Sequence, residues 1–222
     1  NPSSFRYLHV HHKLLKILDK LWTNQLIDDL VKSNKLPSNL IYKYNLTKKF
    51  NKSIKEQAYD ISHKNKNILL LDISKAFDSV SWKLIKTKLK NSLIDKLGDK
   101  GIKYYRKYIN LINNRKCYYQ DNLINVKRGI PTGLPSSVLV FSLILETIIS
   151  EYVNKLHQLN IKHLIDYKIS IFVDDICIEI INQKHKKAIS YYILEIIERN
   201  DFKINIQKCK ASKNLALEQF KI

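Results

Sequence analysis

Apolar and polar residues alternate on both sides of one acidic pair, Asp174–Asp175. The apolar members of this pattern are Ile169, Ile171 and Val173 before the pair, and Ile176, Ile178 and Ile180 after it. A repeat of two predicts two short strands joined at the pair. Adjacent carboxylates repel each other, and a divalent cation with oxygen ligands, Mg²⁺ or Mn²⁺, is the usual compensation. Taken alone, the pair is more simply explained as a solvated turn.

A second acidic position follows a short apolar run. Ile68 to Leu71 is typical of a buried strand, and Asp72 stands at its end. A carboxylate there, facing another strand's acidic pair, is the geometry needed to hold two metal ions about 3.5–4 Å apart. Alone, Asp72 is equally typical of a helix N-cap.

Apolar residues at helical spacing predict the helices of the chain. Residues 81–97 carry an apolar side chain at every fourth position, and residues 13–32 carry them at steps of three and four before Pro37 ends the region. Two more helices are expected at 136–158 and 186–200. The longest apolar run, 138–149, is broken by polar residues and too short to span a bilayer, so no membrane partner is expected.

The segment 128–137 reads R-G-I-P-T-G-L-P-S-S. Two glycines and two prolines within these ten residues predict a loop of defined shape, in a chain with only four of each. Gly133 lets the backbone approach a flat partner closely, and Pro135 is tolerated where the next helix opens. An ordinary loop before a helix explains the same residues.

Together these segments resemble the palm of a reverse transcriptase, most closely those of non-LTR retrotransposons and group II introns. In the family's order, 69–80 resembles motif A, 128–137 motif B, 172–175 motif C and 202–210 motif D. The resemblance implies RNA-directed DNA polymerase activity with two Mg²⁺ ions, or Mn²⁺ in their place. It also implies an RNA template, a nucleic-acid primer and dNTP substrates as partners.

The resemblance assigns roles to individual residues. Asp72, Asp174 and Asp175 are similar to the catalytic carboxylates that bind metal, and the backbone carbonyl of Ile73 would complete the metal shell. The nucleotide-binding residues implied by the resemblance are Lys75, Ala76, Phe77, Thr132, Gly133, Lys208 and Arg6.

Phe77 lies at the position of the family's steric gate, where a large ring excludes a ribose 2′-OH. Core packing is its alternative role. Thr132 departs from the Gln that is common in the family, and it reaches less far toward the sugar. Lys208 resembles the motif D lysine that could assist departure of pyrophosphate, and Arg6 lies in a weak form of the motif 1 segment. The basic stretch 48–55 could track template phosphates or form a solvated helix face.

The fold implied is α+β, with a small antiparallel, ferredoxin-like sheet forming a palm beside helical fingers. Residues 1–66 are expected to form part of the fingers and 67–222 the palm. The chain lacks Met at its start and stops soon after motif D, which leads us to expect a fragment without the thumb.

Composition agrees with a nucleic-acid partner. Lys and Arg number 39 against 20 Asp and Glu, a formal net charge of +19, which favours binding to polyanions. The three cysteines are scattered, as in reduced intracellular proteins of the cytoplasm or nucleus. His9, His11 and His12 lack the Cys or acidic neighbours of a zinc site.

Three alternatives stay open. An RNA-dependent RNA polymerase has a similar motif B, but such enzymes carry Asn where this chain has Phe141 and usually Gly where it has Val173. A domesticated, inactive relative that only binds RNA is a second alternative, against which the intact carboxylate set argues. The third is an unrelated basic nucleic-acid-binding protein whose motifs match by chance.

Overall fold

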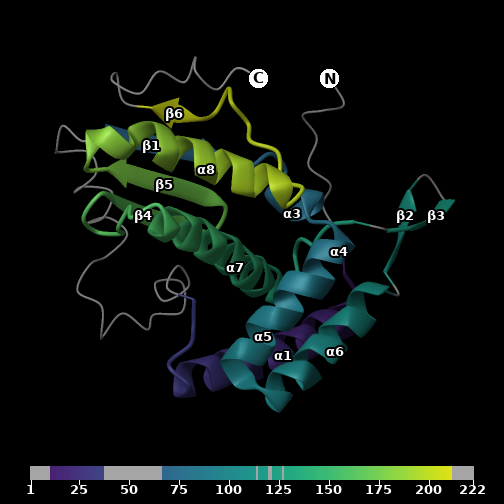
Figure 1. Ribbon diagram of the computed structural model, residues 1–222. Helices are drawn as coiled ribbons and strands as arrows, with labels where there is room; N and C mark the ends of the chain where they lie inside the picture. The colour runs from purple at the N-terminus through teal and green to yellow at the C-terminus, as the bar shows by residue number, and fades with distance from the viewer. Residues whose placement is uncertain (1–10, 38–66, 114, 120–121, 127, 212–222) are drawn as a thin grey trace. The chain divides into compact units, whose positions relative to one another are not determined.

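The computed structural model describes residues 11–37, 67–113, 115–119, 122–126 and 128–211. The chain forms two compact units (Figure 1). One combines Asn1–Leu36 with Phe77–Ile144, and the other combines Pro37–Ala76 with Leu145–Ile222. Helices and an antiparallel sheet occur together, so the α+β prediction is confirmed. The predicted division at residue 66 stays a prediction.

The second unit contains a four-stranded antiparallel sheet in the order β4-β5-β1-β6. Its strands are β1 (Asn67–Asp72), β4 (Tyr167–Phe172), β5 (Asp175–Ile180) and β6 (Lys210–Ala211). The predicted strands around the acidic pair and before Asp72 are thereby confirmed. Alternation puts Leu69, Leu71, Ile176 and Ile178 on the buried face, each at most 3% exposed. The residues between them in sequence point to the opposite face.

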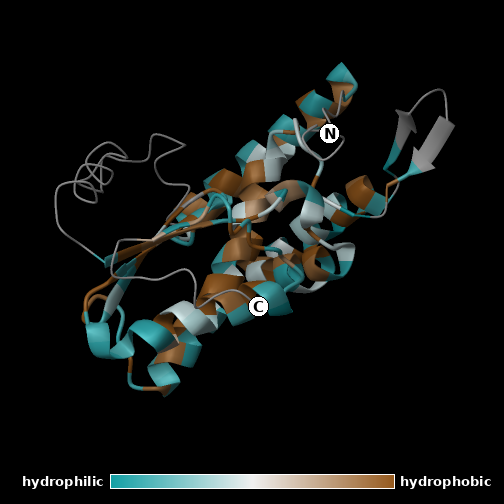
Figure 2. Cartoon of the chain, turned by 90° about the horizontal axis from the view of Figure 1, so that it is seen from above, coloured by the Kyte–Doolittle hydropathy of each residue, from teal (hydrophilic) through white to brown (hydrophobic). Residues whose placement is uncertain are grey.

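Helices cover the buried face of this sheet. The second half of α7 (Ser136–Gln158) brings the Tyr152 ring to 5.8 Å from the ring of Tyr167 in β4. The Tyr152 hydroxyl also donates a 3.0 Å hydrogen bond to the carbonyl of Ile189 in α8 (Lys186–Arg199). Figure 2 shows brown, hydrophobic residues along both the strands and the helices that meet in this layer. The sheet therefore has one packed face and one face that is more open.

The first unit is mainly helical. α1 (Lys13–Lys32) packs Trp22 against Tyr104 and Tyr108 of α6 (Asp99–Asn113), with ring centroids 6.0 and 5.7 Å away. A Cβ on Gly101 would lie 2.0 Å from the carbonyl oxygen of Leu93, so only glycine permits this approach of α6 to α5 (Lys90–Leu97). The unit also contains α3 (Ala76–Ser79) except its first residue, and a hairpin of β2 (Lys116–Tyr119) and β3 (Asn122–Asn125). A short 3₁₀ turn, Gln183–His185, precedes α8 in the other unit.

The predicted helix at 81–97 is present but not uniformly α-helical. It runs from α4 (Trp82–Leu84) through a π-helical segment, Ile85–Leu89, into α5. Apolar residues at steps of four drift around a helix of 3.6 residues per turn. The wider π-helical turn offsets that drift. Ile85, Leu89 and Leu93 are in consequence all fully buried.

The predicted helices at 13–32 and 136–158 match α1 and α7, and α8 ends one residue before the predicted Asn200. Among the described helices, only α7 has the length and hydropathy that could cross a membrane, and 67% of its most apolar window is buried inside the protein. Such burial is also typical of the core helix of a soluble protein.

A buried carboxylate joins the start of β4 to the end of β5. Asp166 accepts hydrogen bonds from the backbone N–H of Lys162 (2.7 Å) and from the Asn182 side chain (2.8 Å). Its own carbonyl accepts bonds from the N–H groups of Ile181 and Asn182, each 2.9 Å. The Lys162 bond, followed by that from Asn182, lowers the pKa of Asp166 below its ordinary 3.8.

We predict that Asp166→Asn lowers the thermal unfolding midpoint at neutral pH. A lowered pKa in the folded state means that the ionised carboxylate stabilises the fold above pH 3.8. This contribution is lost as pH falls through the lower folded pKa. The difference in midpoint between wild type and variant should therefore shrink below pH 3.8, as measured by circular dichroism. The exposed Asp95→Asn is the control, and a pH-independent difference would contradict the prediction.

Candidate active site

Two of the predicted catalytic carboxylates lie directly opposite each other. In the β1–β5 register, Asp72 pairs with Asp175, next to the pair formed by Leu71 and Ile176. Because Leu71 and Ile176 face the packed core, alternation puts both acidic side chains on the more open face. Strand register thus brings together two residues that are about 100 positions apart in sequence.

The backbone N–H and C=O groups of Asp72 form their hydrogen bonds on the side of β1 that faces away from β5. Its N–H donates to Sγ of Cys209 (3.4 Å), and its carbonyl accepts from the N–H of Asn205 (2.8 Å). The pair of Asp72 with Asp175 is consequently a non-hydrogen-bonded one, in which opposing side chains come closest. The motif D segment therefore fixes the strand end that carries the first carboxylate.

The backbone N–H and C=O groups of Ile73 point to the opposite side of the strand from those of Asp72. Ser74 donates its N–H to the carbonyl of Lys203 (2.7 Å), and Ile73 faces Ile204 across an antiparallel bridge. Successive carbonyls along a strand point to opposite sides. The carbonyl of Ile73 is therefore directed toward the side of β1 on which β5 and its acidic turn lie.

The third carboxylate lies in a tight turn. Phe172 pairs with Asp175, which leaves Val173 and Asp174 as a two-residue hairpin loop. Val173 has a φ of 58°, a left-handed conformation that a β-branched residue rarely adopts. Backbone strain of this kind costs on the order of 1–3 kcal/mol and clusters at functional sites. The turn holds Asp174 next to Asp175 despite that cost.

The carboxylates influence one another electrostatically. Burial first, then the negative charges of Asp174 and Asp72, raise the pKa of Asp175, whereas the ammonium of Lys208 lowers it. The exposed Lys208 is therefore close enough to interact with this cluster. A cation would relieve the repulsion among the three carboxylates.

The donor set suits a hard divalent cation, because it consists of carboxylates and a carbonyl. Across the described ranges, however, no three His, Cys, Asp or Glu side chains converge closely enough to enclose a metal ion. Binding would have to draw the three carboxylates together. The residue types and their strand register fit a metal site, while the side-chain positions are not yet those of a closed one.

The remaining motif A residues begin α3. Lys75 has a φ of 48° and an exposed side chain, whereas Ala76 is 4% exposed. The left-handed residue turns the chain sharply after Ser74. Both predicted nucleotide-binding positions thus belong to the unit that carries the carboxylates.

Phe77, Thr132 and Gly133 belong to the other unit. The carbonyl of Phe77 accepts a 2.9 Å bond from the N–H of Ile130, and that of Val80 accepts a 2.8 Å bond from Gly129. These bonds join the end of motif A to the start of motif B.

At Gly129 the φ is 87°, and an added Cβ would lie 3.1 Å from the carbonyl oxygen of Asp78. Both features require glycine at this junction. Phe77 is half-buried and stacks on the buried Phe141, with ring centroids 4.8 Å apart. Part of the Phe77 ring therefore packs against the core, in line with the alternative role considered for it.

The motif B loop exposes Gly133, whose φ is 87°. Thr132 is half-buried, and its hydroxyl has no hydrogen-bond partner among the described residues. His11 contacts the Thr132 carbonyl at 3.0 Å, and His12 caps α1 by accepting a hydrogen bond from the N–H of Leu14. Arg6, His9 and the basic stretch 48–55 lie outside the described residues.

Sequence reasoning missed Asn205 and Cys209, which hold the backbone of Asp72. Motif D drew attention only to its lysine, and no periodic pattern marks a residue that acts through a backbone contact. The one signal in the sequence that could have pointed to Cys209 is its position directly after Lys208, the residue that resembles the motif D lysine.

Comparisons with known proteins identify a family and a similar fold. The sequence profile of a family described as "Reverse transcriptase (RNA-dependent DNA polymerase)" matches residues 1–219. Among solved structures, apo telomerase from Candida tropicalis, truncated from its C-terminal domain, aligns with a TM-score of 0.52 and 16% identity. The alignment covers 88% of this chain and 39% of that one, and it shows likeness of fold. No curated protein sequence matches significantly.

We predict that Cys209→Ala speeds hydrogen exchange of the Asp72 amide. The variant removes the acceptor of that N–H, and a lost hydrogen bond of this kind costs about 1 kcal/mol. Exchange at Asp72 should be several-fold faster, measured by NMR or mass spectrometry. Cys177→Ala, at the other described free cysteine, is the matched control. Equal protection in both variants would show that Sγ does not hold the strand end.

Proposed function

Because the chain belongs to the reverse transcriptase family, we propose that it carries the active site for RNA-templated addition of dNTPs to a primer 3′ end. The observation that supports this most directly is the close pairing of Asp72 with Asp175 beside the Asp174 turn. Two carboxylates on the more open face of a sheet, with a third in the adjoining turn, suit phosphoryl transfer better than they suit fold stability.

Asp72, Asp174, Asp175 and the carbonyl of Ile73 would hold Mg²⁺. When bound, a pair of such ions stabilises the attacking and leaving oxygens of an in-line displacement. Lys208, within electrostatic reach of Asp175, would neutralise charge on the departing pyrophosphate. Lys75 and Ala76, at the turn after Ile73, would offer backbone N–H groups to the triphosphate.

The motif B loop would contact the nucleotide and template. The exposed Gly133 presents backbone without a side chain, which suits a flat base. Thr132 has a hydroxyl that lacks a partner among the described residues and could bond to a sugar. Phe77, with one side packed on Phe141, would present its remaining surface as the steric gate.

One observation bears on the RNA-polymerase alternative. Phe141 is fully buried and stacked on Phe77, at the position where those enzymes carry an Asn that reads the 2′-OH. A buried phenyl ring cannot make that hydrogen bond, which favours a DNA-making enzyme. The similarity to non-LTR retrotransposon and group II intron enzymes is part of this proposal. RNA binding is also part of it, and the net positive charge of the chain would favour such binding.

We predict that Asp174→Asn in the complete protein lowers primer extension at least about a thousandfold. An amide cannot supply the charge that attracts Mg²⁺, and removing a major electrostatic contributor has effects of this size. The measurement is single-turnover extension on an RNA template. Glu179→Gln, another carboxylate of β5, serves as the control. Near-normal extension by the Asp174 variant would refute the assignment.

We predict that Phe77→Val raises ribonucleotide use relative to deoxyribonucleotide use. A smaller side chain removes a steric clash with the 2′-OH without replacing any polar group. The measurement is the ratio of kcat/KM for dNTP and NTP. Ile112→Ala, at a fully buried residue of α6 in the same unit, controls for general destabilisation of about 2–5 kcal/mol. Parallel loss of both rates at an unchanged ratio would assign Phe77 to the core alone.

A further inference from the structure

Two charged side chains are buried among the residues that the structure describes, Asp19 and Asp166. Asp166 joins neighbouring strand ends, as described above. Asp19 lies in α1, outside the motifs, and is 5% exposed. A buried carboxylate lowers stability unless it is well partnered, so the partner of Asp19 is informative.

That partner is the first residue of α7. Oδ2 of Asp19 accepts a 2.8 Å hydrogen bond from the backbone N–H of Ser136. The first turn of α7 contains no acidic residue of its own, and its N–H groups lack partners within the helix. A carboxylate at this end is favoured by the helix dipole. Asp19 thus caps α7 from a different helix.

The same region holds the motif B loop at a second point. His11, just before α1, contacts the carbonyl of Thr132 at 3.0 Å. The loop from Thr132 to Ser136 is therefore attached at both ends, with the exposed Gly133 between them. Ser137 adds an internal bond from its hydroxyl to the carbonyl of Pro131.

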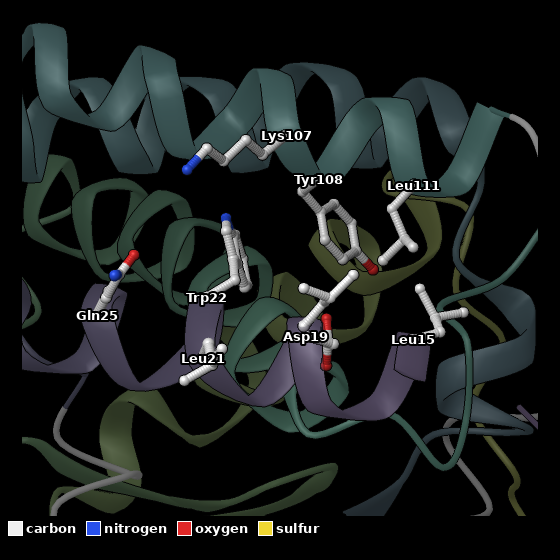
Figure 3. A pocket seen from close by; sticks show the side chains of 9 residues that line it. Leu15, Asp19, Leu21, Trp22, Gln25, Lys107, Tyr108 and Leu111 are labelled. Carbon is white, nitrogen blue, oxygen red and sulfur yellow. The ribbon is translucent and has the colours of Figure 1, made fainter. Parts of the chain in front are cut away.

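The surroundings of Asp19 are otherwise mainly apolar. It lines a cavity of about 450 Å³ between α1 and α6, with Leu15, Trp22 and Leu111 among its walls. Figure 3 shows the Asp19 side chain rising from α1 on the side where Tyr108 descends from α6. Burial raises the pKa of Asp19, and the bond from Ser136 opposes that shift.

An apolar residue would fill this position at lower desolvation cost. The bond to Ser136 is therefore better explained by the position that it gives to the start of α7 than by a gain in stability. We propose that Asp19 is a positioning residue for nucleotide binding, which sets the start of α7 and through it the Thr132–Gly133 backbone. The proposal rests on the function proposed above.

The test uses Asp19→Ala and Asp19→Asn in the complete protein, with the exposed Asp28→Ala of the same helix as control. Asp19→Ala removes both acceptor and charge, whereas Asp19→Asn keeps an acceptor. We expect KM for dNTP to rise about tenfold in Asp19→Ala, as for a lost hydrogen bond to a charged group. The rise should be about threefold in Asp19→Asn, with kcat nearly unchanged in both.

Hydrogen exchange at the Ser136 amide provides a readout independent of catalysis. It should be faster in Asp19→Ala and near wild type in Asp28→Ala. Unchanged KM in both Asp19 variants would overturn the proposal, and if Asp19→Ala fails to fold, unchanged KM in Asp19→Asn decides alone. A parallel loss of kcat and thermal stability at constant KM would also overturn it.

These outcomes are separable from failure of the proposed function. If wild-type protein does not incorporate dNTPs, or Asp174→Asn extends primers normally, the function itself is wrong. If wild type is active and Asp174→Asn is not, constant KM in the Asp19 variants rejects only the positioning role.

Discussion

The fixed register between β1 and β5 is the constraint on which the arrangement of the three carboxylates depends. Asp72 and Asp175 are opposed without a hydrogen bond between their backbones, which brings their side chains to the closest spacing that strands allow. A slip of one residue would turn Asp72 into the packed face and Leu71 out of it. The buried leucines and isoleucines of β1 and β5 prevent that slip. Hydrophobic packing on one face thereby fixes the charge arrangement on the other.

Local backbone devices support this arrangement. Val173 accepts a left-handed conformation so that the hairpin turns within two residues and presents Asp174. Asn205 and Cys209 bind the peptide groups of Asp72 from the side away from β5. Because these bonds hold the peptide groups of Asp72, its carboxylate is attached to a fixed strand end. Such preorganisation reduces the reorganisation cost of binding and reaction.

Much of this fold could be predicted because strong periodicity marks its main elements. A short apolar run identified β1, period-two alternation identified β4 and β5, and a long apolar stripe identified α7 with its bounds. α6 was missed because its buried face is built largely from Tyr104 and Tyr108 within a polar segment. β6 is two residues long and exists only through pairing with β1. The contacts of Asp72 with Cys209 and of Asp19 with Ser136 join distant residues through backbone atoms, which leave no pattern in the sequence.

The acidic residues whose pKa is shifted differ in the cause of the shift. Asp166 and Asp29 have lowered pKa values because hydrogen bonds satisfy their charges, from backbone and Asn182 in one case and from Lys100 and Tyr104 in the other. Asp175 differs, because neighbouring carboxylates contribute to raising its pKa and Lys208 only partly offsets them. Hydrogen bonds within the fold satisfy the charges of Asp166 and Asp29. Asp175, whose pKa is raised in part by neighbouring carboxylates, therefore differs from Asp166 and Asp29, and this difference supports the proposal that the reaction takes place at β1 and β5.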